Sequence, residues 1–474
     1  MQWQAWILAL GAAAAPAAPP DYLNYVITFA DTLLAKGADE FGPRRTALWA
    51  GVIDTRTMTV PESDVPPPRG VRPDDRAVGG SNLYHDAVTI RVFRALSEVT
   101  GRPKYRDAAQ AYMRDFLELA QSPRTGLLAW GEHLYYDLFR DRVAAERRHH
   151  ELLEWTPPWP ELWEANPDAV ARAIAGLRYH FYEDNPRALF NRHADWDNAS
   201  HQKPGGQPWI KHSGLYAYSF LFLYSRTGDE RWLHWGRGAG ELYWNHRNPA
   251  TNLTLGCIGD PRPTSSQASS QAPELAYWLF KAWETYPREA GFRERAIALV
   301  KAYNKYFYDA RRGAIRASVA LDGKPLSEAV NGPWNIAYGQ PGILPNGRIE
   351  AYLGRATKDP EFIEMAKQIH RIAKETPLPE GVSIEGIAFA LNLALDLYDL
   401  TKERRFLDDA RQYAEYAVVH FWKQGPGGAL FVRQAGDVYY EAKTGAGDLL
   451  AGLLRLHLRL NPKLPEPKTY DWSF

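Results

Sequence analysis

The sequence has almost no cysteine, since Cys257 is the only one among 474 residues. A single thiol cannot form an intrachain disulfide, and it excludes cysteine-based metal clusters and CxxC redox motifs. Net charge is missing as well, because 56 Lys and Arg residues balance 56 Asp and Glu residues. Nucleic acids and anionic membrane surfaces select proteins with a basic excess, so the composition argues against both as main partners.

Long apolar runs are also scarce. One short run lies in residues 1–20, MQWQAWILALGAAAAPAAPP, and it is far below the roughly 20 residues needed to span a bilayer. An apolar stretch followed by small residues and prolines is typical of a signal peptide, although no Lys or Arg precedes it here. We therefore expect residues 1–20 to be a signal peptide and the protein to be periplasmic or secreted, with no membrane insertion. Residues 21–474 show no linker or change of composition and are predicted to form a single domain.

Aromatic residues are abundant, with 17 Trp and 26 Tyr against only four Met. Such amphipathic rings stack on flat polar ligands such as sugars, but they also pack well between helices. Four tryptophans near polar motifs are candidate stacking platforms for a sugar: Trp130, Trp155, Trp159 and Trp209.

Apolar residues recur at helical spacing over most of the chain. The clearest segments are 21–36, 85–101, 105–120, 167–182 and 384–400. Strand alternation is scarce, and GALFVRQAGDVYYE at 428–441 is the best candidate for a β-hairpin. The pattern predicts an all-α protein with minor β structure.

A repeat stands at the predicted helix ends. TGRPKY, TGDERW, TKDPEF and TKERRF begin at Thr100, Thr227, Thr357 and Thr401, which are 127, 130 and 44 residues apart. In each copy we expect the threonine to end one helix and the aromatic residue five positions later to open the next. The spacing indicates a helical hairpin of roughly 40–45 residues, with intermediate copies that have diverged.

Six or seven such hairpins form either an open solenoid or a closed α/α toroid. Long insertions rich in Gly, Pro and Asn favour the toroid, because they would gather as loops around one mouth of the ring. These insertions are residues 65–80, 195–208, 256–273 and 331–347.

Three segments are rich in metal-binding and acid–base residues: WGEHLYYD (130–137), HHELLEWTPPWPELW (149–163) and NRHADWD (191–197). A divalent metal that activates a carboxylate substrate needs neutral imidazoles, a carboxylate and open coordination positions. His133, Glu151 and His193 would supply one ligand from each segment. The spacing matches no local signature such as HExxH, and an isolated histidine is more often a surface or capping residue.

The order GEH, then HEL with its glutamate 18 residues after His133, then RH with its histidine 42 residues further on, resembles the metal site of polysaccharide lyase family 2. The resemblance covers roughly residues 125–195. It implies an α/α toroid, a periplasmic pectate or exopolygalacturonate lyase, and a manganese-type cation on His133, Glu151 and His193. It also implies that Arg192 is the base. After HEL the chain continues Leu-Glu-Trp, where the family has a basic residue.

The implied reaction is coherent. Removal of the C5 proton of a uronate builds an enolate whose charge a bound cation neutralises, and the C4 oxygen then leaves by β-elimination. A free guanidinium stays protonated to about pH 12, so an arginine base requires positive groups crowded around it. The alternative for Arg192 is a salt bridge to Asp195 or Asp197. Lys211, His212 and Arg348 are candidates to bind further carboxylates of a polyuronate.

Two other functions remain open. A hydrolase that releases a uronic acid, glucuronidase-like, would need two carboxylates roughly 5 to 10 Å apart. Asp195 or Asp197 with Glu151, Glu274 or Glu385 would supply them. A non-catalytic carbohydrate-binding toroid would explain the aromatic residues and the repeat alone. We expect a metal-assisted lyase that acts on a pectate-like polysaccharide or a uronate-containing oligosaccharide, and the sequence leaves the oligomeric state open.

Overall fold

The computed structural model describes residues 21–146, 148–152, 157–259, 267–334, 342–468 and 470. The expected signal peptide, residues 1–20, and the candidate platform Trp155 therefore lie outside the described residues. Within the described part of the chain, every helix is too short or too polar to cross a bilayer.

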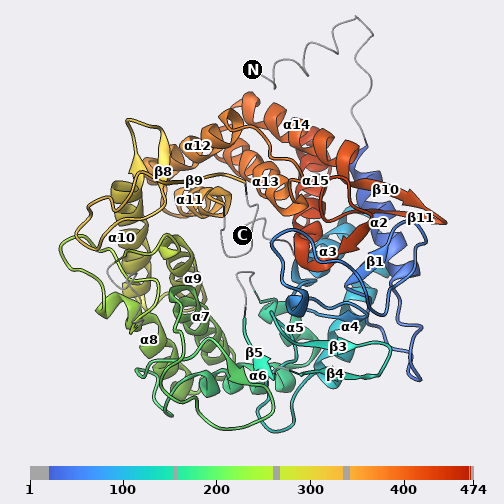
Figure 1. The fold of residues 1–474 in the computed structure, drawn as a ribbon, viewed down its shortest axis with the longest axis horizontal. Helices are drawn as coiled ribbons and strands as arrows, with labels where there is room; N and C mark the ends of the chain where they lie inside the picture. Colours follow the sequence, from blue (N-terminus) through green and yellow to red (C-terminus); the bar gives the residue numbers. More distant parts are fainter. Residues whose placement is uncertain are drawn as a thin grey trace, which may run out of the picture.

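Helices follow one another around a closed ring, in an inner and an outer layer (Figure 1). The inner layer contains α3 (Ala87–Thr100), α7 (Ile210–Thr227), α9 (Ala272–Thr285), α11 (Leu344–Thr357), α13 (Ile384–Thr401) and α15 (Ala446–Leu460). Against them pack α4 (Lys104–Leu119), α8 (Glu230–Asn245), α10 (Ala290–Phe307), α12 (Pro360–Glu375), α14 (Arg404–Phe421) and α2 (Tyr22–Lys36). The short helices α5 (Trp159–Ala165) and α6 (Pro167–Gly176) lie between α4 and α7. The predicted α/α toroid is confirmed.

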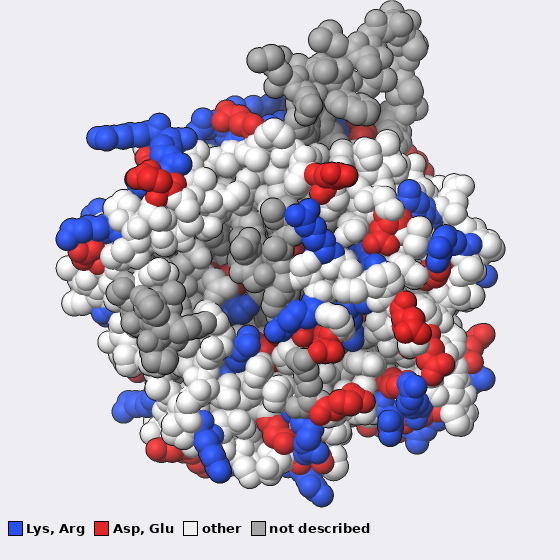
Figure 2. Space-filling model, in the orientation of Figure 1, with Lys and Arg blue, Asp and Glu red and all other residues white. Residues whose placement is uncertain are grey.

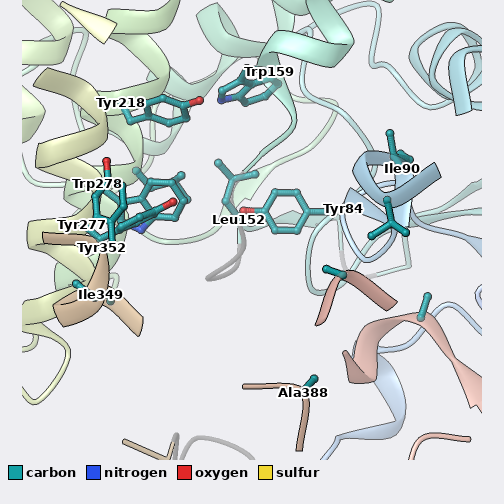
Figure 3. Close-up of a cluster of buried hydrophobic side chains, with 14 of the residues drawn as sticks. Tyr84, Ile90, Leu152, Trp159, Tyr218, Tyr277, Trp278, Ile349, Tyr352 and Ala388 are labelled. Carbon is teal, nitrogen blue, oxygen red and sulfur yellow. The ribbon is translucent and has the colours of Figure 1, made fainter. Parts of the chain in front are cut away.

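The two layers differ in burial as their sequences require. In α13 most side chains are apolar, and twelve residues are buried because the helix has neighbours on several sides. In α12 the buried residues recur at three- and four-residue spacing, because only one stripe meets the core while the rest faces water. Aromatic side chains fill the space where inner helices meet, including Tyr218 of α7 and Trp278 of α9 (Figure 3).

The threonine repeat is a helix-ending turn. All four threonines are the last residue of an inner helix, and each hydroxyl donates to the carbonyl of a leucine four residues earlier, at 2.6–2.9 Å. Each hydroxyl also accepts the N–H two residues later. The residue that follows each threonine, Gly101, Gly228, Lys358 or Lys402, has a left-handed backbone that reverses the chain. Thr285 at the end of α9 makes the same bond to Lys281 and is one of the diverged copies.

The expected length of the repeat holds for only part of the ring. Helix α13 begins 40 residues after α11, but the other inner helices lie further apart because long loops separate the hairpins. The loops carry small antiparallel sheets of β2 (Gly80–Ser81), β3 (Tyr135–Asp137) and β4 (Arg142–Ala144), of β5 (His149–His150) and β6 (Ala194–Asp195), and of β7 (Tyr308–Asp309), β8 (Ala314–Arg316) and β9 (Val330–Asn331).

The predicted hairpin over residues 428–441 is wrong. Strand β11 (Gly428–Phe431) pairs with the preceding β10 (Trp422–Gly425), while β12 (Tyr439–Glu441) pairs with β1 (Val52–Asp54). Pro426 and Gly427 form the tight turn between β10 and β11, and Gly427 has a positive φ of 73° that suits glycine. The residues that favour a tight turn precede residue 428, so β11 pairs with β10 and not with a later strand.

The ring closes where the first and last segments of the described chain meet. Helix α15 packs against α2 and α3, next to the pairing of β1 with β12. Beside this seam Arg76 makes a bidentate ion pair with Glu441, which also binds Arg433, and all three side chains are buried. Arg433 also pairs with Asp437 at 2.8 Å, so two carboxylates compensate the two guanidinium charges across the seam.

Candidate functional site

The pairing of β5 with β6 brings two of the predicted ligands together. His149 lies opposite Asp195, and His150 lies opposite Ala194. One step further along the same antiparallel register, Glu151 lies opposite His193. Cross-strand neighbours project to the same face of a sheet, so the register directs the carboxylate of Glu151 toward the imidazole of His193. Their Oε2 and Nε2 atoms are 2.7 Å apart.

Gly131 brings the third segment to this pair. It forms a parallel bridge with Glu151, and the N–H of the next residue, Glu132, donates to the carbonyl of Glu151 at 3.3 Å. Gly131 has a φ of +85°, and a Cβ built on it would lie 1.8 Å from that carbonyl oxygen. Only glycine permits this approach. The glycine of the GEH motif therefore places His133 over Glu151.

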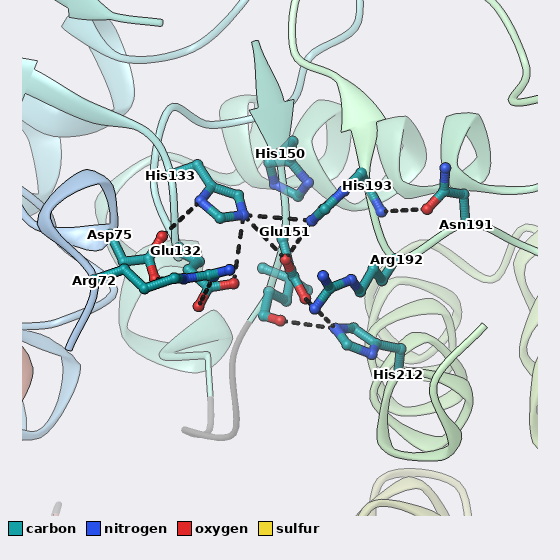
Figure 4. A network of polar contacts seen from close by, with 12 residues as sticks. Arg72, Asp75, Glu132, His133, His150, Glu151, Asn191, Arg192, His193 and His212 are labelled. Carbon is teal, nitrogen blue, oxygen red and sulfur yellow. Dashed lines mark hydrogen bonds and ion pairs between the residues drawn. The ribbon is translucent and has the colours of Figure 1, made fainter. Parts of the chain in front are cut away.

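The three predicted ligands converge on one point (Figure 4). His133 Nε2 is 3.3 Å from Glu151 Oε2 and 3.3 Å from His193 Nε2. Two metal–ligand bonds of about 2.1 Å that meet at about 90–110° separate their outer atoms by about 3.0–3.4 Å. Two imidazole nitrogens and a carboxylate oxygen suit a divalent cation of the zinc or manganese type. Two of the three separations match this range, and the third, between His193 Nε2 and Glu151 Oε2, is a hydrogen bond of 2.7 Å. The residue types and their convergence therefore fit such a cation.

A second layer of charged groups surrounds His133. Its Nδ1 faces Asp75 Oδ1 at 3.1 Å, so that its Nε2 points to Glu151. A carboxylate on the far nitrogen is the usual support of a metal-binding histidine. Arg72 pairs with both Asp75 and Glu132. Lys443 donates to the backbone oxygen of Asp75 at 2.7 Å.

The ionisation of these groups reflects burial and crowding. Burial opposes ionisation of Glu151, but the hydrogen bonds from three histidines outweigh it and hold its pKa well below the usual range. Burial and the nearby charge of Glu151 raise the pKa of Glu132 to about 7. Burial disfavours the charged form of His133, yet its bonds to Asp75 and Glu151 outweigh burial and raise its pKa to about 9. The buried carboxylates of Asp75, Glu132 and Glu151 therefore favour a positively charged group placed between them.

Arg192 joins this cluster. Its Nη1 lies 3.4 Å from Glu151 Oε1, and its side chain is 24% exposed. The alternative prediction, a salt bridge to Asp195 or Asp197, is wrong, because the strand pairing turns Asp195 toward Arg148 instead. Arg192 thus contacts the predicted ligand Glu151 and is partly exposed to solvent.

Asp195 and Asp197 have structural partners outside the ligand cluster. Asp195 binds Arg148 through both carboxylate oxygens, and Asp197 accepts from Ser122 Oγ at 2.7 Å. Of the other acids considered for a hydrolase, Glu274 lies on α9 and Glu385 in the first turn of α13.

His212 contacts Glu151 and the backbone of the next residue, Leu152. It is buried, its Nε2 lies 2.9 Å from the Leu152 carbonyl oxygen and 3.5 Å from Glu151 Oε1, and burial lowers its pKa. The prediction that it binds further substrate carboxylates is therefore wrong. Lys211 and Trp209 are half-buried at the start of the same helix, and the charge of Lys211 acts on His212. These two remain beside the site.

Three predicted substrate-binding residues are core residues instead. Trp130 and Trp159, from two different segments, are each 1% exposed and pack against one another. Arg348 is 5% exposed on α11, where it pairs with Asp396. These predictions are wrong, since buried rings and a buried ion pair do not present a surface to a polymer.

Four site residues were missed in the sequence: Arg72, Asp75, Glu132 and Lys443. Glu132 is adjacent to His133 within the quoted GEH motif, which is a signal that could have found it. Arg72 and Asp75 lie in the insertion at 65–80, whose position near the mouth was expected. Lys443 comes from the short helix η4 (Ala442–Thr444), and no local pattern links it to a residue 368 positions earlier.

The comparisons with known proteins cover the part of the chain that carries the site. The model of a family described as periplasmic pectate lyase matches residues 67–273, which include the three predicted ligands and Arg192. The predicted resemblance is confirmed. A pectate disaccharide-lyase of Dickeya dadantii (strain 3937) is 26% identical over 264 residues, which are 50% of this chain and 47% of that protein. The chain thus spans about half the length of this curated relative.

Solved structures share the fold at low sequence identity. Cellobiose 2-epimerase from Bacillus thermoamylovorans B4167 has a TM-score of 0.50 at 10% identity, over 92% of this chain and 99% of that one. A sugar epimerase from a ruminal bacterium has a TM-score of 0.50 at 9% identity, over 79% of this chain and 99% of that one. At these identities the similarity concerns the fold alone.

Proposed function

We propose that this chain, which resembles periplasmic pectate lyases over residues 67–273, is a polysaccharide lyase. It cleaves a pectate-like, uronate-containing glycan by metal-assisted β-elimination in the periplasm. The observation that carries the proposal is the convergence of His133, Glu151 and His193 on one point, with Arg192 3.4 Å from Glu151. A hollow in the face of the ring, bordered by several Lys and Arg side chains (Figure 2), suits an anionic polymer.

His133, Glu151 and His193 would hold the cation, which we expect to be Mn²⁺. When bound, it supplies a positive charge that stabilises the negative charge developing on the uronate carboxylate. Asp75 holds the ring of His133 with Nε2 turned toward the cation position. His212 likewise orients Glu151 by contacting its Oε1 atom. The ligands are thus oriented before substrate arrives.

Arg192 takes the proton from C5 of the uronate. The C5–H and C4–O bonds break, a C4–C5 double bond forms, and the C4 oxygen leaves with the neighbouring sugar and acquires a proton from water. Arg192 is placed for this role because its side chain is partly exposed beside the predicted ligands, although its contact with Glu151 favours the charged guanidinium. A neighbouring cation opposes protonation of the guanidinium, which a base requires.

The arrangement supports elimination over hydrolysis. A hydrolase needs an acid and a second carboxylate on opposite sides of the bond, but Asp195 and Asp197 are occupied by Arg148 and Ser122. Glu151 is surrounded by three histidines. Each of these three carboxylates is therefore held by partners of its own.

An ultraviolet absorbance assay on a panel of polyuronates tests the proposal. Elimination creates an absorbing C4–C5 double bond, so absorbance should rise with Mn²⁺ and stop with chelator. Release of reducing sugar without absorbance would identify a hydrolase. Binding of the polymer without cleavage would identify a carbohydrate-binding protein.

Two variants separate the roles of neighbouring residues. His193→Ala should lose Mn²⁺ binding and activity together, whereas Arg192→Ala should retain Mn²⁺ and lose activity. Arg124→Ala is the matched control, because this arginine is 71% exposed and faces Asp197 at 3.9 Å. Full activity in both His193→Ala and Arg192→Ala would contradict the proposal.

A further inference from the structure

Two buried histidines that the proposed reaction does not use lie beneath the ligand cluster. His150 ends β5 and precedes the predicted ligand Glu151, and alternation along the extended chain turns its side chain to the opposite face. His180 ends the short helix η2 (Leu177–His180). They are 1% and 0% exposed, respectively. Their rings meet edge to face (Figure 4 shows His150 behind Glu151).

A chain of three hydrogen bonds runs through these two rings. Trp130 Nε1 donates to His150 Nε2 at 3.3 Å. His150 Nδ1 lies 2.8 Å from His180 Nε2. His180 Nδ1 lies 3.0 Å from the carbonyl oxygen of Asn191.

The two ends of the chain allow one arrangement of its protons. An indole N–H only donates, so His150 Nε2 must accept and its proton must be on Nδ1. A carbonyl oxygen only accepts, so His180 Nδ1 must carry a proton, and its Nε2 accepts from His150. Both imidazoles are therefore neutral Nδ1–H tautomers, and a flip of either ring would break two bonds.

The chain joins the three segments that carry the ligands. Trp130 begins the segment that leads to His133, and His150 is adjacent to Glu151. Asn191 begins the third segment: its N–H donates to the His180 carbonyl at 2.9 Å, and its Oδ1 accepts the N–H of His193 at 3.1 Å. His180 thus holds Asn191 through both backbone and side chain.

We propose that His150 and His180 are positioning residues whose fixed tautomers clamp the three ligand-bearing segments and preorganise the metal centre. This inference rests on the proposed function, because it assigns the clamp to the same cation. A clamp built from neutral rings adds no charge near the ligands, so it sets distances without competing for the metal. It also places Arg192, the residue between Asn191 and His193.

Titration with Mn²⁺ alone, followed by the electron paramagnetic resonance signal of free Mn²⁺, tests the clamp in the full chain. His180→Phe keeps an aromatic ring but removes both hydrogen bonds, and the Kd for Mn²⁺ should rise about tenfold or more. His370→Phe is the matched control: His370 is also buried, 5% exposed, but it lies on α12 against Phe406. It should lower the Tm without changing the Kd.

The wild-type protein gives an independent readout. With ¹⁵N-labelled histidine, NMR should show His150 and His180 as Nδ1–H tautomers whose protons exchange slowly with water. The Trp130→Phe variant removes the donor to His150 Nε2 but leaves the bond to His180, so His150 should stay the Nδ1–H tautomer while its Nε2 resonance shifts. This measurement needs neither metal nor a variant that loses His180.

The outcomes separate the clamp from the proposed function. If folded His180→Phe binds Mn²⁺ as tightly as the wild type, or if either ring is an Nε2–H tautomer, the clamp is refuted and the lyase proposal stands. If the wild type itself does not bind Mn²⁺, the metal-assisted function fails, and the positioning role fails with it.

Discussion

Replacement of Gly131 by alanine should displace Glu151, because the added Cβ atom would clash with its backbone. The Cβ would stand 1.8 Å from the carbonyl oxygen of Glu151, whereas contacts under 3.0 Å are essentially never seen, so the two backbones must separate by about 1.2 Å. The left-handed backbone adds about 1 kcal/mol and the overpacking about 1–3 kcal/mol, a total of about 2–4 kcal/mol. Displacement of the ligand by about 1 Å should lower lyase activity roughly a hundredfold.

Gly101→Ala isolates the backbone cost. Gly101 has a φ of +68°, but a Cβ at this position would meet no atom within 4 Å, so this variant should lose only about 1 kcal/mol and keep full activity. Urea unfolding measures both variants, and Mn²⁺ titration with the absorbance assay measures the site. Wild-type Mn²⁺ affinity and activity in Gly131→Ala would refute the role assigned to the GEH glycine.

Three further variants test charge assignments. Asp195→Asn should retain lyase activity, whereas a hydrolase that uses this acid would lose it. Burial raises the pKa of Asp86 to about 7, although its hydrogen bond from Tyr112 acts in the opposite direction. Between about pH 4 and 7 the folded state therefore binds a proton that the unfolded state has lost, and wild-type stability falls as the pH rises through this window. Asp86→Asn, measured by urea unfolding, should therefore gain up to about 4 kcal/mol over wild type across that window; a constant difference would contradict the assignment. Burial raises the pKa of Glu350 well above its usual range despite Asn304, so Glu350→Gln should change the unfolding free energy at pH 7 by under about 1 kcal/mol, and a larger gain would mean an ionised carboxyl.

Local patterns were sufficient to predict the helical class and the turns. The threonine repeat was legible because its hydroxyl bonds reach only four residues back and two forward. The contact among His133, Glu151 and His193 was predicted through the family resemblance, since their separations of 18 and 42 residues carry no helical or strand period. The register of β5 and β6 supplies the missing physical reason.

The wrong predictions concern strand pairing, burial and ion pairs that depend on residues far apart in the sequence. Strand β11 pairs with β10 through the turn at Pro426 and Gly427, whereas β12 pairs with β1, near the other end of the chain. Burial of Trp130 and Trp159 depends on which side of the ligand segment faces the core, which composition does not reveal. The partner of Arg192 depends on the same register that turned Asp195 toward Arg148.

Closure of the ring has a consequence for how the protein folds. Arg76 and Glu441 are 365 residues apart, and Asp75 and Lys443 are 368 apart, so the seam and the edge of the predicted metal site form in the same long-range event. Bringing such remote segments together carries a large loop-closure entropy, while each helical hairpin needs only local contacts. Hairpins should therefore gain protection from hydrogen exchange during refolding before the seam does, and Mn²⁺ binding should appear only with the last phase.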